Sequence, residues 1–351
     1  MAGLRRVLLG LWLEIRVIPV LLWSFTAITL GTALAWHDGD GIAVGGYLAA
    51  VAVGVLLQGL VAHCVNEIAD WRSGTDRDPA PRVISGGSKV IASGLLGPRE
   101  LRLTGIAAAV AATALGFLAA AQWGWILLAY GAAGLAGAVL YTLPPVRASY
   151  RPFAGEAVAF ACIWGCTTGA YVLQRGELSG GAALAGIAYA ASCVAMLMMH
   201  HYLDRLPDSR ALPPKTTTIV LLGRAGRRYA VLWAAIALVG ACVLTALVDD
   251  RFVIAAAAFA AALVVHATVD PADPASVTRA ELAVIVLGML GGLGTAAALA
   301  PPLLWALGAA AVLVPIELVL AGLAHRDLMA ARSERSSRSP GGGPADTPGL
   351  S

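Results

Sequence analysis

The sequence predicts an all-α protein, a polytopic membrane bundle in which apolar helices pack side by side. Of its 351 residues, 59% are hydrophobic and only 13% are charged, and the mean hydropathy is +0.78. Such a composition is typical of membrane proteins. Crossing the hydrocarbon layer takes about 20 apolar residues in a helix, and runs of that kind recur along the whole chain. Because many others follow the first run, we expect it to be a true span and not a cleaved signal peptide.

Ten apolar runs define ten expected helices. They lie at about 16–36, 42–65, 101–121, 124–143, 152–174, 180–203, 229–248, 251–267, 281–300 and 302–324. The runs are rich in Ala and Gly, which lets helix backbones approach closely. All five cysteines lie in or at the edge of these runs without zinc-ligand spacing, so we interpret them as structural.

The distribution of Arg and Lys predicts the orientation in the cell membrane. The basic residues concentrate at the N-terminus, in three connecting loops and in the C-terminal tail, while the intervening loops carry only Arg175 and Arg251. The positive-inside rule then places the basic loops and both termini on the cytoplasmic side. Termini on one side require an even number of spans, which favours ten helices over nine. We expect one transmembrane domain over 1–325, followed by a disordered tail at 326–351 that is rich in Ser, Gly and Pro.

The second apolar run ends in a stretch dense in carboxylates and cations, NEIADWRSGTDRDPAPRVISGGSKV, which begins at Asn66. If the helix continues, Asn66 and Asp70 lie on one face, with Glu67 close by. Asp76 follows the turn expected at Gly74. These oxygen ligands suit Mg²⁺, which shares its remaining sites with water and substrate phosphates. Taken alone, the stretch fits an ordinary solvated loop equally well.

A second acidic stretch begins at His200 and reads HHYLDRLPDSRALPPK. Asp204 and Asp208 are four residues apart and face the same way if the helix continues through Pro207. By the charge distribution this loop lies on the same membrane face as the first.

The cations near the two acidic stretches indicate a shared anionic ligand. Lys89 and Lys215 are the only lysines in the chain, one in each loop, and Arg72, Arg82 and Arg210 lie nearby. Charge so close to the hydrocarbon is costly and is by default a functional hypothesis. Two acidic clusters that converge at the bundle mouth would hold Mg²⁺ ions against one diphosphate. Nucleic-acid binding is not supported, because the basic residues are interleaved with acids instead of forming one patch.

These stretches resemble the UbiA-type membrane prenyltransferases. NEIADWRSGTD is similar to the first acidic motif of that superfamily, and LDRLPDSRALPPKTTTIVLLGR to its second. The spacing in the first motif, together with WLEIRVIPVLLWSFTAITLGTALA, GGSKVIASGLLGPREL and YTLPPVRASYRPFAGEAVAF, most resembles the 1,4-dihydroxy-2-naphthoate prenyltransferase branch, which makes menaquinone precursors. The likeness covers roughly residues 10–300.

The resemblance implies a nine-helix core with both motifs at its cytoplasmic mouth, so the run after Pro302 would be a tenth helix. It also implies roles for particular residues. The residues expected to bind the diphosphate through Mg²⁺ are Asn66, Glu67, Asp70, Asp76, Asp204 and Asp208. Those expected to neutralise the charge of the leaving group directly are Arg82, Lys89 and Lys215. Contacts with the prenyl diphosphate or the acceptor are expected from Asn66, Arg72, Arg210 and Glu156.

The sequence departs from the branch at three places. Glu67 stands where the family usually has Asp, and about two extra residues, including Pro213 and Pro214, separate Asp208 from Lys215. His200 and His201 replace a usual pair of Asn. The two histidines would orient the acceptor or take its proton, or they would only bind headgroups or backbone.

The predicted function is therefore transfer of an isoprenyl group from a prenyl diphosphate to a small aromatic acceptor, 1,4-dihydroxy-2-naphthoate being favoured. A second hypothesis keeps the ionisation but ends in terpene cyclisation or in transfer to a specialised-metabolite acceptor, as the altered histidine pair suggests. A transporter is the remote alternative, because the charges gather in loops and not at the membrane midplane. The sequence does not determine the oligomeric state.

Overall fold

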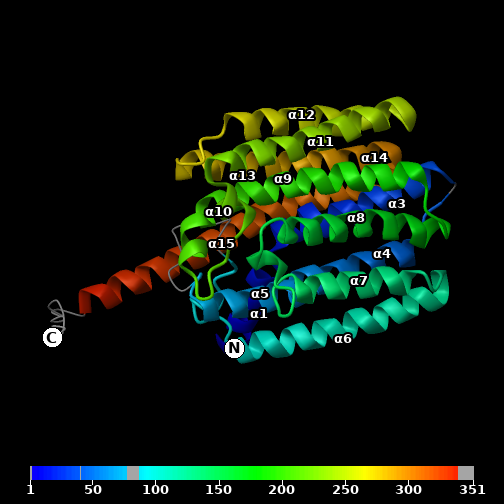
Figure 1. Ribbon diagram of the computed structural model, residues 1–351. Helices are drawn as coiled ribbons and strands as arrows, with labels where there is room; N and C mark the ends of the chain where they lie inside the picture. The colour runs from blue at the N-terminus through cyan, green and yellow to red at the C-terminus, as the bar shows by residue number, and fades with distance from the viewer. Residues whose placement is uncertain (1, 40, 77–86, 339–351) are drawn as a thin grey trace.

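The computed structural model describes residues 2–39, 41–76 and 87–338. Over these residues the chain is almost entirely helical and contains no strand, which confirms the all-α prediction. The helices run roughly side by side in one bundle, and α15 extends from one end of it at an angle (Figure 1). Arg82, predicted to contact the leaving group, lies outside the described residues.

The described part of the chain forms fifteen α-helices: α1 (Ala2–Ile15), α2 (Val17–Val20), α3 (Thr26–His37), α4 (Val44–Gly54), α5 (His63–Ser73), α6 (Pro98–Trp123), α7 (Leu127–Leu140), α8 (Ala154–Arg175), α9 (Gly180–Arg210), α10 (Thr218–Leu222), α11 (Gly226–Leu247), α12 (Val253–Thr268), α13 (Pro274–Met289), α14 (Thr295–Leu299) and α15 (Leu304–Arg338). Short π-helical segments join α2 to α3, α4 to α5 and α13 to α14, so each pair acts as one long helix.

In the part of the chain that is described, nine helices are long and apolar enough to cross a membrane. The run predicted at 124–143 forms only α7, which has 14 residues and is therefore about 21 Å long. Gly124 stops the preceding helix with a φ of 126°, and Pro144 and Pro145 follow soon after α7. With α7 counted as a crossing, α1 and the C-terminal end of α15 lie at the same end of the bundle, as an even number of crossings requires (Figure 1).

Several helices extend further than their apolar runs. The helix that contains α5 continues from the apolar run to Ser73, where Gly74 ends it with a φ of 89°. α9 continues through Pro207 to Arg210. Both acidic stretches therefore begin on helices, as the spacing of their carboxylates predicted. α15 also remains helical to Arg338, past the boundary expected at 325/326.

The centre of the bundle is formed by α3 and α9, which are the most deeply buried of the long helices. α9 packs against α8 and α11, and α3 packs against α8 and α14. Small residues permit this: a Cβ at Gly31 of α3 would collide with the carbonyl oxygen of Thr167 of α8. By contrast, α6 exposes large apolar side chains, among them Val110 and Leu118, as a lipid-facing helix does.

Candidate active site

The two acidic stretches meet at Lys215. Its Nζ donates a hydrogen bond to Asp70 Oδ2 at 3.2 Å and lies 3.9 Å from Asp208 Oδ1. The backbone helps to hold this arrangement, because the Lys215 N–H bonds the Asp208 carbonyl at 3.0 Å and the Leu212 N–H bonds the Ser73 carbonyl at 3.0 Å. The predicted convergence of the two stretches is thus present in the fold.

Lys215 is a buried cation held by carboxylates. Although burial lowers the pKa of its ammonium group, the neighbouring Asp70 and Asp208 carboxylates outweigh that effect and raise the pKa of Lys215 well above its ordinary value. The group therefore stays charged, and its Nζ also lies 5.7 Å from the centre of the Tyr150 ring. A fixed positive charge of this kind can stabilise negative charge that develops on a bound group.

The first motif lies on one helical face, as its spacing predicted. Asn66 Nδ2 donates to Asp70 Oδ2 at 2.9 Å. Two residues from the loop after α7 complete the arrangement: Thr142 Oγ1 donates to Asn66 Oδ1 at 3.2 Å, and the Tyr150 hydroxyl donates to Asp70 Oδ1 at 3.2 Å. The orientation of Asp70 is therefore set by three donors from three parts of the chain.

Asp76 is a buried carboxylate whose charge the described residues do not balance. Burial and then the nearby charges of Asp70 and Glu67 raise its pKa well above the ordinary value. Its Oδ2 atom has no hydrogen-bond partner in the described chain. Gly87 covers this point, since a Cβ there would lie 2.6 Å from Asp76 Oδ2 and 2.8 Å from Glu67 Oε2. A buried carboxylate oxygen without a hydrogen bond, close to a second acid, fits a divalent cation.

The second motif also presents unpartnered oxygens. Both carboxylate oxygens of Asp208 are buried without a hydrogen bond in the part of the chain described. However, no three His, Cys, Asp or Glu side chains among the described residues are close enough to hold a metal ion by themselves. These residues therefore fit Mg²⁺ as partial ligands, with water or ligand phosphates completing the shell.

Glu67 faces a different partner from its neighbours in the motif. Its Oε2 accepts from the Ser88 N–H at 3.0 Å, and the Ser88 hydroxyl donates to Glu14 Oε2 at 2.5 Å. Glu14 of α1 is fully buried, and burial together with the charge of Glu67 raises its pKa to about 8. Glu14 is therefore a protonated acid at neutral pH, and this connection ties α1 to the first motif.

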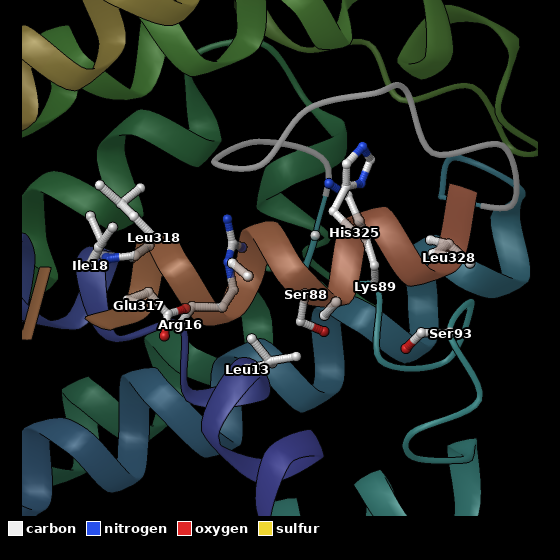
Figure 2. Close-up of a pocket in the computed structure, with 14 residues that line it drawn as sticks. Leu13, Arg16, Ile18, Ser88, Lys89, Ser93, Glu317, Leu318, His325 and Leu328 are labelled. Atoms are coloured by element: carbon white, nitrogen blue, oxygen red, sulfur yellow. The ribbon is translucent and has the colours of Figure 1, made fainter. Parts of the chain in front are cut away.

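Lys89 lies at the edge of a cleft between α15, the start of α2 and the loop 87–93. The cleft has a volume of about 50 Å³, and its polar lining includes Arg16, Ser88, Glu317 and His325. Figure 2 shows Arg16, Lys89 and His325 around this space, with α15 along one side. Lys89 is buried and lines this cleft, whose lining does not include Lys215.

Backbone strain gathers at this end of the bundle. Among the described residues, four that are not glycine have a positive φ, namely Arg16 (52°), Lys89 (61°), Arg147 (47°) and Phe153 (64°). Arg16 and Lys89 line the same cleft, and Arg147 and Phe153 lie within three residues of Tyr150. Such conformations cost about 1–3 kcal/mol each and cluster at functional sites.

The two histidines of the second stretch have different environments. His200 Nδ1 lies 2.7 Å from Glu281 Oε1, and His200 Nε2 lies 3.7 Å from Asp204 Oδ2. His201 Nδ1 is buried without a hydrogen bond among the described residues. The two histidines, which the sequence analysis treated as a pair, therefore have different partners.

Three other predicted residues differ in how far they are exposed. Arg72 and Arg210 are exposed. Glu156 lies in the first turn of α8, is 3% exposed, and has an Oε1 atom with no hydrogen bond in the described chain.

Sequence reasoning missed four residues that the structure places at the site: Glu14, Thr142, Tyr150 and Glu281. Two signals could have found them. Thr142 and Tyr150 fall in the YTLPPVRASYRPFAGE stretch, and Glu14 and Glu281 are lone acids at the edges of apolar runs.

The fold and the site together define a membrane-embedded helical protein with a cluster of carboxylates and a buried lysine at one end of the bundle. A family model described as the UbiA prenyltransferase family matches residues 21–282, about three quarters of the chain. The chain belongs to the UbiA prenyltransferase family.

Solved structures with the same fold agree with this assignment. One is a UbiA homolog from Archaeoglobus fulgidus bound to DMAPP and Mg²⁺, with a TM-score of 0.59 and 12% identity over 82% of this chain and 99% of that one. The same homolog bound to GPP and Mg²⁺ gives a TM-score of 0.58, with 12% identity and the same coverage. A digeranylgeranylglyceryl phosphate synthase gives 0.52, with 13% identity over 84% of this chain and 100% of that one. No curated protein matches the sequence significantly.

Proposed function

We propose that this protein is an integral-membrane, Mg²⁺-dependent prenyltransferase that moves an isoprenyl group from a prenyl diphosphate to an aromatic acceptor. The favoured acceptor is 1,4-dihydroxy-2-naphthoate, which would place the reaction in menaquinone synthesis. The observation that carries the proposal is the contact of Lys215 with Asp70 and Asp208, because it brings two acidic motifs and a fixed cation to one point. The complexes of the A. fulgidus homolog with a prenyl diphosphate and Mg²⁺ support it.

The residues divide into ligands and charge donors. Asn66, Asp70, Asp76, Asp204 and Asp208 would hold Mg²⁺, with Glu67 alongside, and the ion would supply positive charge against the departing diphosphate. Lys215 donates its Nζ–H to the same region, and Lys89 and Arg82 would add positive charge to it. As the bond from the allylic carbon to the diphosphate oxygen breaks, these cations stabilise the charge that collects on the leaving group.

The bundle supplies the second half of the reaction. The electron-poor allylic carbon is attacked by the electron-rich acceptor ring, which then loses a proton or, for dihydroxynaphthoate, its carboxylate as CO₂. Apolar helices around the site exclude water, which would otherwise capture the cation. We place the mouth and both termini on the cytoplasmic side, as the charge distribution favours. Arg72, Arg210 and Glu156 would bind the substrates at the rim.

A second candidate keeps the ionisation and changes the product. His200 stands where the branch usually has Asn and is bonded to Glu281, so the acceptor side of the site differs from the branch pattern. Cyclisation of the prenyl chain, or transfer to a specialised-metabolite acceptor, would use the same metal and lysine cluster.

The test is a product assay with purified protein, Mg²⁺ and a long prenyl diphosphate. It is run with 1,4-dihydroxy-2-naphthoate, with 4-hydroxybenzoate and without an acceptor, and the products are identified by mass. We expect a prenylated, decarboxylated naphthoquinol, and we expect its loss in Asp70→Ala and Asp204→Ala. Glu177→Gln, an exposed acid outside both motifs, is the matched control. A cyclised hydrocarbon formed without acceptor would favour the second candidate, and wild-type turnover in either Asp variant would overturn the metal assignment.

A further inference from the structure

A buried acid on α13 is joined to the first histidine of the second motif. Glu281 is 2% exposed, and its Oε1 lies 2.7 Å from Nδ1 of His200, 81 residues away in sequence. α13 and α9 pack against each other, so the contact crosses a helix interface inside the bundle. A carboxylate in a membrane-spanning helix is costly and marks a functional position by default.

This contact determines how the His200 ring is oriented. The short contact at Nδ1 fixes which edge of the ring faces Glu281, and it leaves Nε2 on the other edge to form a hydrogen bond with another group. Nε2 lies on the opposite side of the ring, 3.7 Å from Asp204 Oδ2, which is longer than a hydrogen bond. The side chain of His200 keeps 20% of its surface exposed, so a ligand in the mouth can reach it.

The neighbouring histidine lacks such an anchor. The centre of the His201 ring lies 6.2 Å from that of His200, and its Nδ1 has no hydrogen-bond partner among the described residues. Of the two histidines, only His200 has a carboxylate within hydrogen-bond distance among the described residues. The acceptor side of the site therefore has one oriented imidazole, beside the carboxylates assigned to the metal.

We propose that Glu281 is a positioning residue for the acceptor half of the reaction. It holds the His200 ring so that Nε2 forms a hydrogen bond with a hydroxyl group of the aromatic acceptor. The inference rests on the proposed prenyl transfer and narrows it: the acceptor is a hydroxyl-bearing ring. His200 orients this ring beside the allylic carbon, while the cluster around Lys215 and Asp70 serves the ionisation of the diphosphate.

The orientation of His200 can be measured without substrates. The protein has six histidines, so ¹⁵N-histidine labelling in lipid bilayers gives few signals, and His200→Gln identifies the relevant one by its loss. We expect the His200 ring nitrogen signals to change in Glu281→Ala, because the ring loses its hydrogen-bond partner, and to stay as in the wild type in Glu177→Gln. An unchanged His200 signal in Glu281→Ala would overturn the positioning role.

The second measurement is the ratio of prenylated product formed to diphosphate released, with the acceptor that the product assay identifies. In Glu281→Ala we expect this ratio to fall at least about tenfold, with diphosphate release within about threefold of wild type, because ionisation does not use His200. Glu281→Gln keeps an oxygen that accepts from Nδ1 and should restore most of the ratio. Glu177→Gln is again the matched control.

The outcomes separate this inference from the proposed function. If Glu281→Ala kept the wild-type ratio of prenylated product to released diphosphate, whether or not both amounts fell together, the positioning role would be refuted. If wild-type protein released no diphosphate with any acceptor, the proposed function would fail, and the histidine signal would still report on the contact between Glu281 and His200.

Discussion

Replacement of Lys215 by Met tests the centre of the site. Met keeps the length of the side chain and removes its charge. At 3.2 Å from Asp70 Oδ2, the ammonium group gains about 5 kcal/mol of Coulomb energy at an effective dielectric constant of about 20. The 3.9 Å contact with Asp208 adds about 4 kcal/mol on the same basis. Most of this gain offsets the cost of burying three charged groups, so the net contribution of the two contacts to the stability of the fold is smaller.

Two consequences follow for Lys215→Met. Removing one partner of a buried pair leaves uncompensated carboxylates and typically costs about 3–5 kcal/mol, so the melting temperature in detergent should fall. Loss of a fixed cation at the leaving group should reduce kcat by about 10²–10³. Mg²⁺ replaces part of the missing charge, and it should raise the melting temperature of the variant more than that of wild type.

The assay combines thermal unfolding, with and without Mg²⁺, and diphosphate release. Lys215→Arg is the matched variant: it keeps the charge and most of the stability, but its planar group fits the compact site less well. If Lys215→Met matched wild type in both turnover and melting temperature, the contact with Asp70 would have no part in the site, and the proposal would lose its main support.

Three further predictions concern other parts of the structure. In wild type, the folded protein keeps the Glu14 proton up to a pKa of about 8, whereas the unfolded chain releases it above the ordinary pKa of 4.5. Between these pH values the wild type therefore loses stability as the pH rises. The stability of Glu14→Gln relative to wild type should rise there by about 1.4 kcal/mol per pH unit. Gly31→Ala should lower stability by about 1–3 kcal/mol, because its methyl group would collide with the α8 backbone. Tyr150→Phe removes the hydroxyl that donates to Asp70 and should lower kcat/KM about tenfold.

Each of these has its own check. Unfolding of wild type and Glu14→Gln is compared at several pH values, and parallel curves would show that Glu14 is not buried as a neutral acid. Gly116→Ala has open space around the new methyl group and should leave the melting temperature unchanged or slightly higher, so an equal loss in both glycine variants would contradict the packing argument. For Tyr150→Phe, steady-state kinetics with unchanged kcat/KM would exclude a role for the bond to Asp70.

Composition and local pattern were sufficient for much of the fold. Apolar runs of about 20 residues predicted the helices, since a backbone in hydrocarbon must satisfy its own hydrogen bonds. The four-residue spacing of Asn66 and Asp70 predicted a shared helical face, and their 2.9 Å contact confirms it. The family assignment also followed from the two acidic motifs. The dihydroxynaphthoate branch and the roles of individual site residues stay predictions.

Tertiary structure decided which residues work together. Lys215 and Asp70 are 145 residues apart, and they become partners only because the loop after α9 meets the end of α5, where the Leu212 N–H bonds the Ser73 carbonyl. The sequence grouped His200 with His201, whereas the structure joins His200 to Glu281, because contacts across helix interfaces depend on rotation about each helix axis. A charge pattern along one chain carries no information about that rotation, so the sequence alone determined the class of protein and its motifs, and the fold determined the partners of each charge.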